Sequence, residues 1–164
     1  MERIIRQLMD FARPVKPVAS EVRVADLLHS SLAQVDMERQ QQQVQVVLAG
    51  QDTPLTLQGD RLRLEQALIN LLRNAIQAAP GGRVRLDWHT TEPGWLVFTV
   101  EDDGPGIDEA DQHRLLEPFF TTKSSGTGLG LAVVDAVVNE HGGRIDVGRS
   151  EWGGAEFSLH LPIN

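Results

Sequence analysis

The sequence has 164 residues, a net charge of −8 and no cysteine. A surface that neutralises nucleic-acid phosphates needs a basic excess, so this acidic balance argues against nucleic-acid binding, although not against one bound nucleotide. Without cysteine there is no disulfide framework and no thiolate metal site. No apolar run approaches the ~20 residues that span a bilayer, and the N-terminus lacks the apolar stretch of a signal peptide. We therefore expect one cytoplasmic domain that makes no membrane contact.

The first twelve residues predict a short helix, because their apolar residues recur at helical spacing. Pro14 and Pro17 end this helix and make residues 13–17 a stiff linker. A helix this short is marginal alone. We expect it to continue an element that precedes Met1 in a longer protein.

The rest of the chain predicts three further helices and several short strands. In order, the expected elements are helix 24–38 with glutamines 40–43 as its polar end, strands 44–49 and 54–58, helix 60–79, strands 83–89 and 95–100, helix 129–141, and strands 144–148 and 155–161. This order indicates an α+β fold, a two-layer sandwich in which three helices cover one face of a mixed, largely antiparallel sheet.

Two asparagines, Asn70 and Asn74, lie one turn apart on the helix 60–79. They therefore share a face, at the margin of the apolar stripe. Two short amides side by side can chelate a ligand, and asparagine is a poor helix former, which makes two in mid-helix unexpected. Two solvated asparagines explain the pair equally well when this helix is taken alone.

An acidic turn, Asp102-Asp-Gly-Pro-Gly106, follows the strand 95–100. A carboxylate at a strand end can accept a hydrogen bond from an exocyclic amine such as that of adenine. A merely polar turn is the simpler alternative, which these residues by themselves favour.

About twenty residues without regular periodicity lead from this turn to a second glycine cluster, at residues 126, 128 and 130, where a helix begins. Glycine lets the backbone approach a ligand closely, and a helix start offers unpaired N–H donors to a phosphate. The pattern is neither a Walker A nor a Rossmann motif. Lys123 precedes the cluster and can reach a terminal phosphate, although an ordinary surface lysine is the default interpretation.

Two adjacent aromatic residues, Phe119 and Phe120, lie in this polar segment. Exposing both is costly, so at least one is expected to pack against the protein or a partner. The five histidines show no metal-ligand spacing, and no serine nucleophile motif is present.

Taken together, four blocks resemble the ATP-binding catalytic domain of bacterial two-component sensor histidine kinases, in the gyrase, Hsp90, histidine kinase and MutL superfamily. The N box, first glycine box, F box and second glycine box are matched by residues 66–78, 100–107, 117–123 and 126–131. Residues 153–157 resemble a third, weaker glycine block. The resemblance covers about residues 22 to 162 and is nearest to the nitrogen-regulation sensor branch. It implies a Bergerat-type sandwich at 22–164, with residues 1–21 as the end of a dimerisation hairpin helix and its linker.

The resemblance also implies ATP and Mg²⁺ as cofactors and assigns roles to matching residues. Asn74, with Asn70 assisting, would hold Mg²⁺; Asp102 would bind the adenine amine; Lys123 would contact phosphate and act with both asparagines in catalysis. Arg73 would point toward the phosphates, and residues 108–125 would form a mobile lid. The implied ATP-binding residues are Asn70, Arg73, Asn74, Ala78, Asp102, Gly104, Gly106, Ile107, Lys123, Gly126, Thr127, Gly128, Leu129 and Gly130.

One substitution indicates the reaction class. Superfamily members that hydrolyse ATP place a glutamate where this chain has Asn70, and an amide cannot act as that base. We therefore expect phosphoryl transfer to a histidine rather than steady hydrolysis. No histidine of this chain has the acceptor's setting, so the acceptor would lie on a dimerisation hairpin outside it.

The expected partners are that hairpin and a downstream response regulator, with the fragment monomeric and the parent, cytoplasmic or membrane-anchored, a homodimer. Two alternatives stay open: a non-catalytic nucleotide-binding or docking module, and a serine kinase of the anti-sigma type.

Overall fold

The computed structural model describes residues 2–12, 18–91, 93–123 and 126–163; the expected linker 13–17 lies outside them. The elements are α1 (Glu2–Ala12), β1 (Ser20–Arg23), α2 (Val24–Gln41), β2 (Gln45–Leu48), β3 (Thr56–Gly59), α3 (Arg61–Ala78), β4 (Arg83–Thr91), β5 (Trp95–Asp102), α4 (Glu109–Gln112), α5 (Gly130–Glu140), β6 (Arg144–Arg149) and β7 (Ala155–Pro162). None of the helices in these ranges is long and apolar enough to span a membrane.

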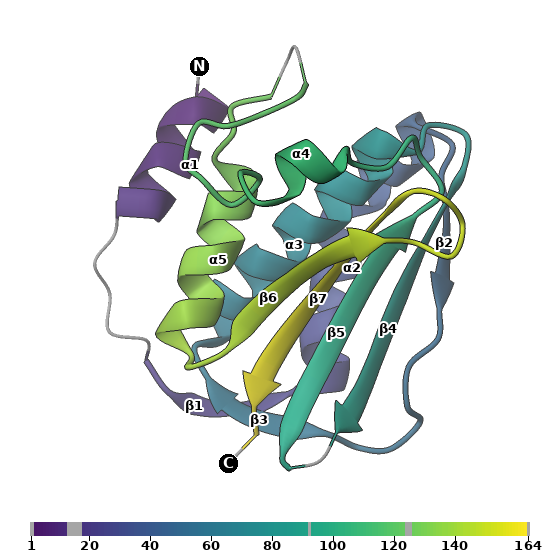
Figure 1. The fold of residues 1–164 in the computed structure, drawn as a ribbon. Coiled ribbons are helices and arrows are strands. Elements are labelled where there is room, and N and C mark those ends of the chain that lie inside the picture. Colours follow the sequence, from purple (N-terminus) through teal and green to yellow (C-terminus); the bar gives the residue numbers. More distant parts are fainter. Residues whose placement is uncertain (1, 13–17, 92, 124–125, 164) are drawn as a thin grey trace.

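Five strands form one mixed sheet in the order β2-β4-β5-β7-β6 (Figure 1). β2 pairs parallel with β4, and the three other pairs are antiparallel. Parallel neighbours need a long crossover, which α3 supplies between β2 and β4. The predicted mixed, largely antiparallel sheet is therefore confirmed.

Helices α2, α3 and α5 cover one face of this sheet, as predicted (Figure 1). Apolar side chains of α3 and of the central strands fill the space between the two layers, with Leu71, Leu72, Leu86, Leu96 and Phe98 fully buried. Along β7 the inward residues are buried and alternate with half-buried ones, which is the pattern of a sheet with one face on the core.

A second, two-stranded sheet was not expected from the sequence. β1 pairs antiparallel with β3, from Ser20 opposite Gly59 to Arg23 opposite Thr56. The expected strand 54–58 therefore exists but does not join the main sheet. Each of these short strands carries one large buried side chain, Val22 in β1 and Leu57 in β3. The domain boundary after residue 21, which falls inside β1, stays a prediction.

Helices α3 and α5 run antiparallel, and specific contacts define the start of α3 and the end of α5. Asp60 caps α3, because its Oδ1 accepts a hydrogen bond from the N–H of Arg63 at 3.2 Å. α5 ends with Gly142 at φ +72°, and the N–H of Gly143 donates to the carbonyl of Val138 at 2.9 Å. This is the backbone pattern that glycine allows at a helix end.

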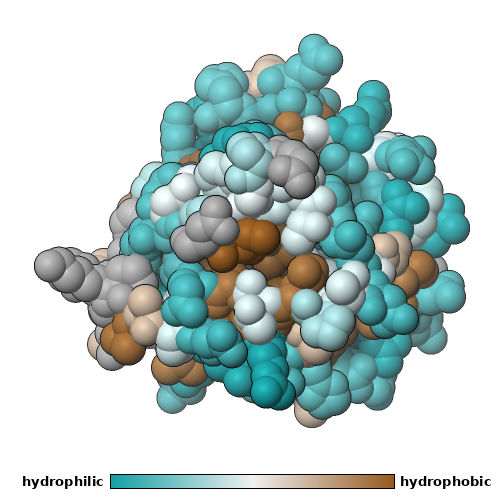
Figure 2. Space-filling model, turned by 90° about the horizontal axis from the view of Figure 1, so that it is seen from below, coloured by the Kyte–Doolittle hydropathy of each residue, from teal (hydrophilic) through white to brown (hydrophobic). Residues whose placement is uncertain are grey.

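The two ends of the sandwich differ. The end of β5, helix α1 and the segment around α4 all lie at the upper end of the molecule in Figure 1, whereas β1, β3 and the C-terminus lie at the bottom. Seen from below, apolar side chains gather in a hollow between polar ones (Figure 2). The short helix α4 lies inside the segment 108–125, which was expected to be irregular.

Truncating a core side chain of α3 is expected to destabilise the fold strongly. Leu71 is 0% exposed, so Leu71→Ala removes buried contacts and should lower the free energy of unfolding by about 2–5 kcal/mol. Leu62→Ala is the matched control on the same helix, because Leu62 is 76% exposed. Urea unfolding of both variants tests this, and equal losses would contradict the position of the core.

Candidate functional site

Asp102 is the last residue of β5 and is almost fully buried, with 1% of its surface exposed. Its Oδ1 accepts hydrogen bonds from the N–H of Gly104 at 2.9 Å and of Ala155 at 3.3 Å. In the part of the chain that the structure describes, both hydrogen bonds go to Oδ1. Oδ2 is therefore left to accept a hydrogen bond from a ligand.

Two glycines let three segments of backbone meet around this carboxylate. A Cβ on Gly104 would lie 2.3 Å from the carbonyl oxygen of Ala78, at the end of α3. A Cβ on Gly154 would lie 2.2 Å from the carbonyl oxygen of Asp102. The predicted residues Ala78, Asp102 and Gly104 are thus brought together, with Gly154 closing the group from the turn before β7.

The two other predicted residues of this turn lie beside that group. Gly106 has φ +78°, and a Cβ there would lie 3.1 Å from the carbonyl oxygen of Gly153. Ile107 is partly buried and packs against the hydrophobic core. The first glycine box therefore packs on the third, weaker block, whose contact with Asp102 the sequence did not indicate.

Lys123 reaches across to α3. Its Nζ donates to Oδ1 of Asn74 at 2.9 Å and lies 3.4 Å from the carbonyl oxygen of the same residue. Oε1 of Gln77 is 3.5 Å away. Burial lowers the pKa of the ammonium, and the Asp102 carboxylate opposes that shift. Asn74 and Lys123, two of the predicted site residues, are therefore in direct contact.

This contact provides a test of whether the site fits a metal ion. The Lys123 ammonium is a cation, and it stands in for a metal at the amide oxygen of Asn74. The oxygen is therefore already directed at a position where a positive charge is stable. An amide oxygen is also a hard ligand of the kind that Mg²⁺ takes. The residues present fit the ion.

Asn70 and Arg73 lie on the side of α3 that faces α1 and α2. Both line a cavity of about 600 Å³, to which α1 and α2 also contribute. The Nε of Arg73 donates to Oε1 of Glu38 on α2 at 2.6 Å. We expected this guanidinium to point toward phosphates; in the structure it is held by a carboxylate, so its phosphate role stays a prediction.

The second glycine box joins the F box to the start of α5. Gly128 has φ +73°, and a Cβ there would lie 2.4 Å from the backbone carbon of Phe119. The N–H of Phe119 donates to the carbonyl of Gly128 at 2.9 Å. Leu129 precedes α5, which begins at Gly130 without a side-chain cap. The first N–H groups of α5 therefore remain for an anionic ligand.

Thr127 connects this box to α1. Its hydroxyl donates to Oε1 of Gln7 at 2.6 Å and accepts from the N–H of Leu129 at 3.3 Å. Gly126 is exposed at the edge of the box.

The two aromatic residues of the F box behave differently. Phe120 packs against the core, and the guanidinium of Arg114 lies 4.3 Å from its ring centroid. Phe119 is 65% exposed and has φ +67°. The prediction that at least one of the pair packs is confirmed.

Comparison with known proteins places the chain in a family. Residues 59–164 match the model of the histidine kinase-, DNA gyrase B- and HSP90-like ATPases. The chain is 36% identical to the signal transduction histidine-protein kinase AtoS of Escherichia coli K12, over 100% of this chain and 27% of AtoS. It is 34% identical to the sensor histidine kinase ZraS of Salmonella typhimurium, over 99% of this chain and 35% of ZraS. The chain thus spans roughly a third or less of these relatives.

Solved structures give the same result. The mycobacterial sensor histidine kinase MprB is 33% identical with a TM-score of 0.78, over 88% of this chain and 97% of that one. Full-length ShkA in complex with AMPPNP is 28% identical with a TM-score of 0.86, over 98% of this chain and 35% of that one. The closer likeness to nitrogen-regulation sensors is not tested by these relatives and stays a prediction.

Gly104→Ala is expected to disrupt the site. The added Cβ would overlap the carbonyl oxygen of Ala78 and should cost roughly 1–3 kcal/mol, while weakening adenosine binding. Gly148→Ala is the control, because a Cβ at Gly148 has nothing within 4 Å. Urea unfolding and adenosine titration measure both effects, and a Gly104→Ala variant that behaves like the control would refute the close contact.

The titration of Asp102 is expected to make the free energy of unfolding depend on pH. Burial raises the pKa of its carboxyl above the ordinary 3.8, although the N–H groups of Gly104 and Ala155 oppose this. The folded state thus holds the proton more tightly than the unfolded chain, so the stability from this group is fully present below pH 3.8 and is lost as the pH rises through the raised pKa.

Asp102→Asn removes that titration. Across this window, the free energy of unfolding of the variant should rise relative to that of the natural protein, measured by urea unfolding at a series of pH values. A difference that stays constant with pH would contradict the prediction.

Proposed function

The chain belongs to the histidine kinase-, DNA gyrase B- and HSP90-like ATPase family, and we propose that it is a Mg-ATP-binding kinase domain that transfers the γ-phosphate to a histidine on a helical hairpin outside this chain. The observation that carries the proposal is the Lys123 ammonium on Oδ1 of Asn74. Amide oxygen, cation and phosphate-binding helix start are the parts that phosphoryl transfer requires.

Asn74, with Asn70 one helical turn earlier on the same face of α3, would hold Mg²⁺. When bound, the ion neutralises phosphate charge and so helps the γ-phosphate to leave ATP. Lys123 would move from Asn74 to a phosphate oxygen when nucleotide enters. Its ammonium is a point charge on a flexible stem, which suits this exchange of partners.

The adenine would bind at the end of β5. Oδ2 of Asp102 would accept from the exocyclic amine, since Oδ1 is engaged by two backbone N–H groups. Ile107 and Ala78 would supply apolar contact to the base, which a pocket for a flat heterocycle needs. A buried acceptor also disfavours bases that present no hydrogen-bond donor at this position, because it would then be left unpaired.

The phosphates would lie between α3 and the start of α5. The N–H groups of residues 128 to 130, at the start of α5, would donate to phosphate oxygens, and the N–H of Leu129 would leave the hydroxyl of Thr127 to do so. Gly128 allows this close approach, because its left-handed backbone is strained for other residues. The segment 108–125 would act as a lid that excludes water.

The reaction would be transfer rather than hydrolysis. Asn70 has no basic group with which to activate water. His141 is engaged in hydrogen bonds with Asp60 and Val137. We propose none of the histidines of this chain as the acceptor of the phosphoryl group. Relatives named as sensor histidine kinases and the AMPPNP complex of ShkA support this reaction class.

The proposed partners follow from the same reaction. The donor domain needs the acceptor hairpin, of which α1 would be the last part, and a response regulator that takes the phosphate onward. The parent protein would be a homodimer through that hairpin and this fragment a monomer, working in the cytoplasm.

Binding of Mg-ATP is the first test. Calorimetry should show binding that requires Mg²⁺, and Asn74→Ala should abolish the Mg²⁺-dependent part while leaving adenosine binding intact. Asn139→Ala is the matched control, because Asn139 is an exposed asparagine on α5. No binding of the natural chain at millimolar ATP would refute the proposal.

Phosphotransfer is the second test. Mixing the domain with an acceptor hairpin from one of its relatives and Mg-ATP should produce acid-labile phosphate on the hairpin histidine. Acid-stable phosphate on serine would favour the anti-sigma type of kinase, and binding without any transfer would favour a docking module.

A further inference from the structure

We propose that Arg63, anchored by Glu140, is a positioning residue for the phosphate end of the site. It fixes α3 against α5 and so sets where Asn70 and Asn74 stand relative to the N–H groups at the start of α5. The inference rests on the proposed function, because it assigns these groups to one bound Mg-ATP.

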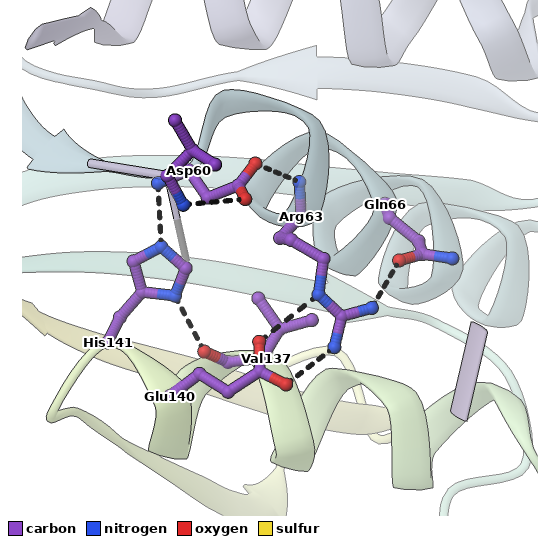
Figure 3. A network of polar contacts seen from close by, with 7 residues as sticks. Asp60, Arg63, Gln66, Val137, Glu140 and His141 are labelled. Carbon is purple, nitrogen blue, oxygen red and sulfur yellow. Dashed lines mark hydrogen bonds and ion pairs between the residues drawn. The ribbon is translucent and has the colours of Figure 1, made fainter. Parts of the chain in front are cut away.

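Arg63 is a charged residue inside the helix layer. It is only 7% exposed, and arginine is almost never so buried unless it is paired. Its Nε donates to Oε2 of Glu140 at 3.1 Å and a terminal nitrogen donates to Oε1 at 2.7 Å (Figure 3). This two-point contact joins the first turn of α3 to the last residue of α5.

The same guanidinium holds a third group. Its other terminal nitrogen donates to Oε1 of Gln66 at 3.0 Å. Arg63, Gln66 and Asn70 all line the cavity of about 600 Å³. At helical spacing these residues lie on one face of α3. Arg63, which binds Glu140, is therefore on the same helix face as Asn70, a predicted metal ligand.

A neutral contact ties the same two helix ends together (Figure 3). The N–H of Asp60 donates to Nε2 of His141 at 2.9 Å, so the ring proton is on Nδ1, which donates to the carbonyl of Val137 at 2.7 Å. Gly59 makes room for the ring, since a Cβ there would lie 2.9 Å from it. The start of α3 therefore contacts the end of α5 at two independent points.

The Arg63–Glu140 pair, here called the clamp, and the proposed phosphate site lie at opposite ends of one helix pair. Along α3, Asn70 and Asn74 stand about 10 and 16 Å beyond Arg63, and along α5, Gly130 stands about 15 Å before Glu140. Because the helices are antiparallel, the two asparagines of α3 and the first N–H groups of α5 lie near the same end of the helix pair, the proposed phosphate end. A slide of α3 along α5 would move both amides past the N–H groups of α5 by the same amount.

An ion pair suits this task better than apolar packing does. Leucine and valine side chains resist separation of the helices, but the hydrophobic effect is non-directional. Two parallel N–H···O bonds fix direction as well as distance. Removing both charges together therefore tests register, whereas removing one leaves an unpaired buried charge and tests stability.

The decisive variant is Arg63→Met combined with Glu140→Leu, which removes both charges and keeps apolar volume. Calorimetry should show that Mg-ATP binds roughly 10- to 100-fold more weakly, as is typical when a supporting contact behind a metal ligand is lost. Adenosine affinity should stay within about twofold, since the base site is built on β5. Thermal unfolding should confirm that the variant is folded.

Arg61→Met is the matched control, because Arg61 is an exposed arginine at the start of the same helix. It should bind both ligands as the natural chain does. Arg63→Lys keeps the charge but not the two-point geometry, and should lose Mg-ATP affinity selectively as well. This single variant decides the matter if the paired variant does not fold.

The outcomes separate this inference from the proposed function. A folded clamp variant that binds Mg-ATP as tightly as the natural chain, or that loses adenosine and Mg-ATP equally, overturns the positioning role alone. A natural chain that fails to bind Mg-ATP overturns the proposed function and the inference with it.

Discussion

The antiparallel packing of α3 against α5 is the contact on which the candidate site depends. α3 carries the two asparagines on its polar face and buries its apolar face on the sheet, while α5 begins uncapped beside the second glycine box. At the far end, Arg63 and Glu140 join the same two helices. The polar groups at the proposed phosphate end would therefore be positioned by a helix pair that is joined at its opposite end.

The sheet supplies the other half of the site through one buried carboxylate. Asp102 ends β5 on the core side, where burial alone would favour its protonated form. Two backbone N–H groups stabilise its charge, and Gly104 and Gly154 let those backbones come close enough to do so. The proposed base recognition would thus depend on backbone contacts that a larger residue at Gly104 or Gly154 would prevent.

Local patterns in the sequence predict most of this architecture. The period of α3 and its cap at Asp60 are local signals, and the mixed sheet agrees with the order of the predicted strands. β1 was missed because a four-residue strand with one buried side chain has almost no period. The pairs Arg63–Glu140 and Arg73–Glu38 were missed because their partners are 77 and 35 residues apart. No spacing rule joins residues at such separations.

The central claim is that the Lys123 ammonium marks the metal position at Asn74. A crystal structure of the domain with Mg²⁺ and a non-hydrolysable ATP analogue tests it most directly. We predict a magnesium ion about 2.0–2.1 Å from Oδ1 of Asn74, with Lys123 moved onto a phosphate oxygen. A metal bound elsewhere, with Lys123 still on Asn74 beneath the bound nucleotide, would contradict it.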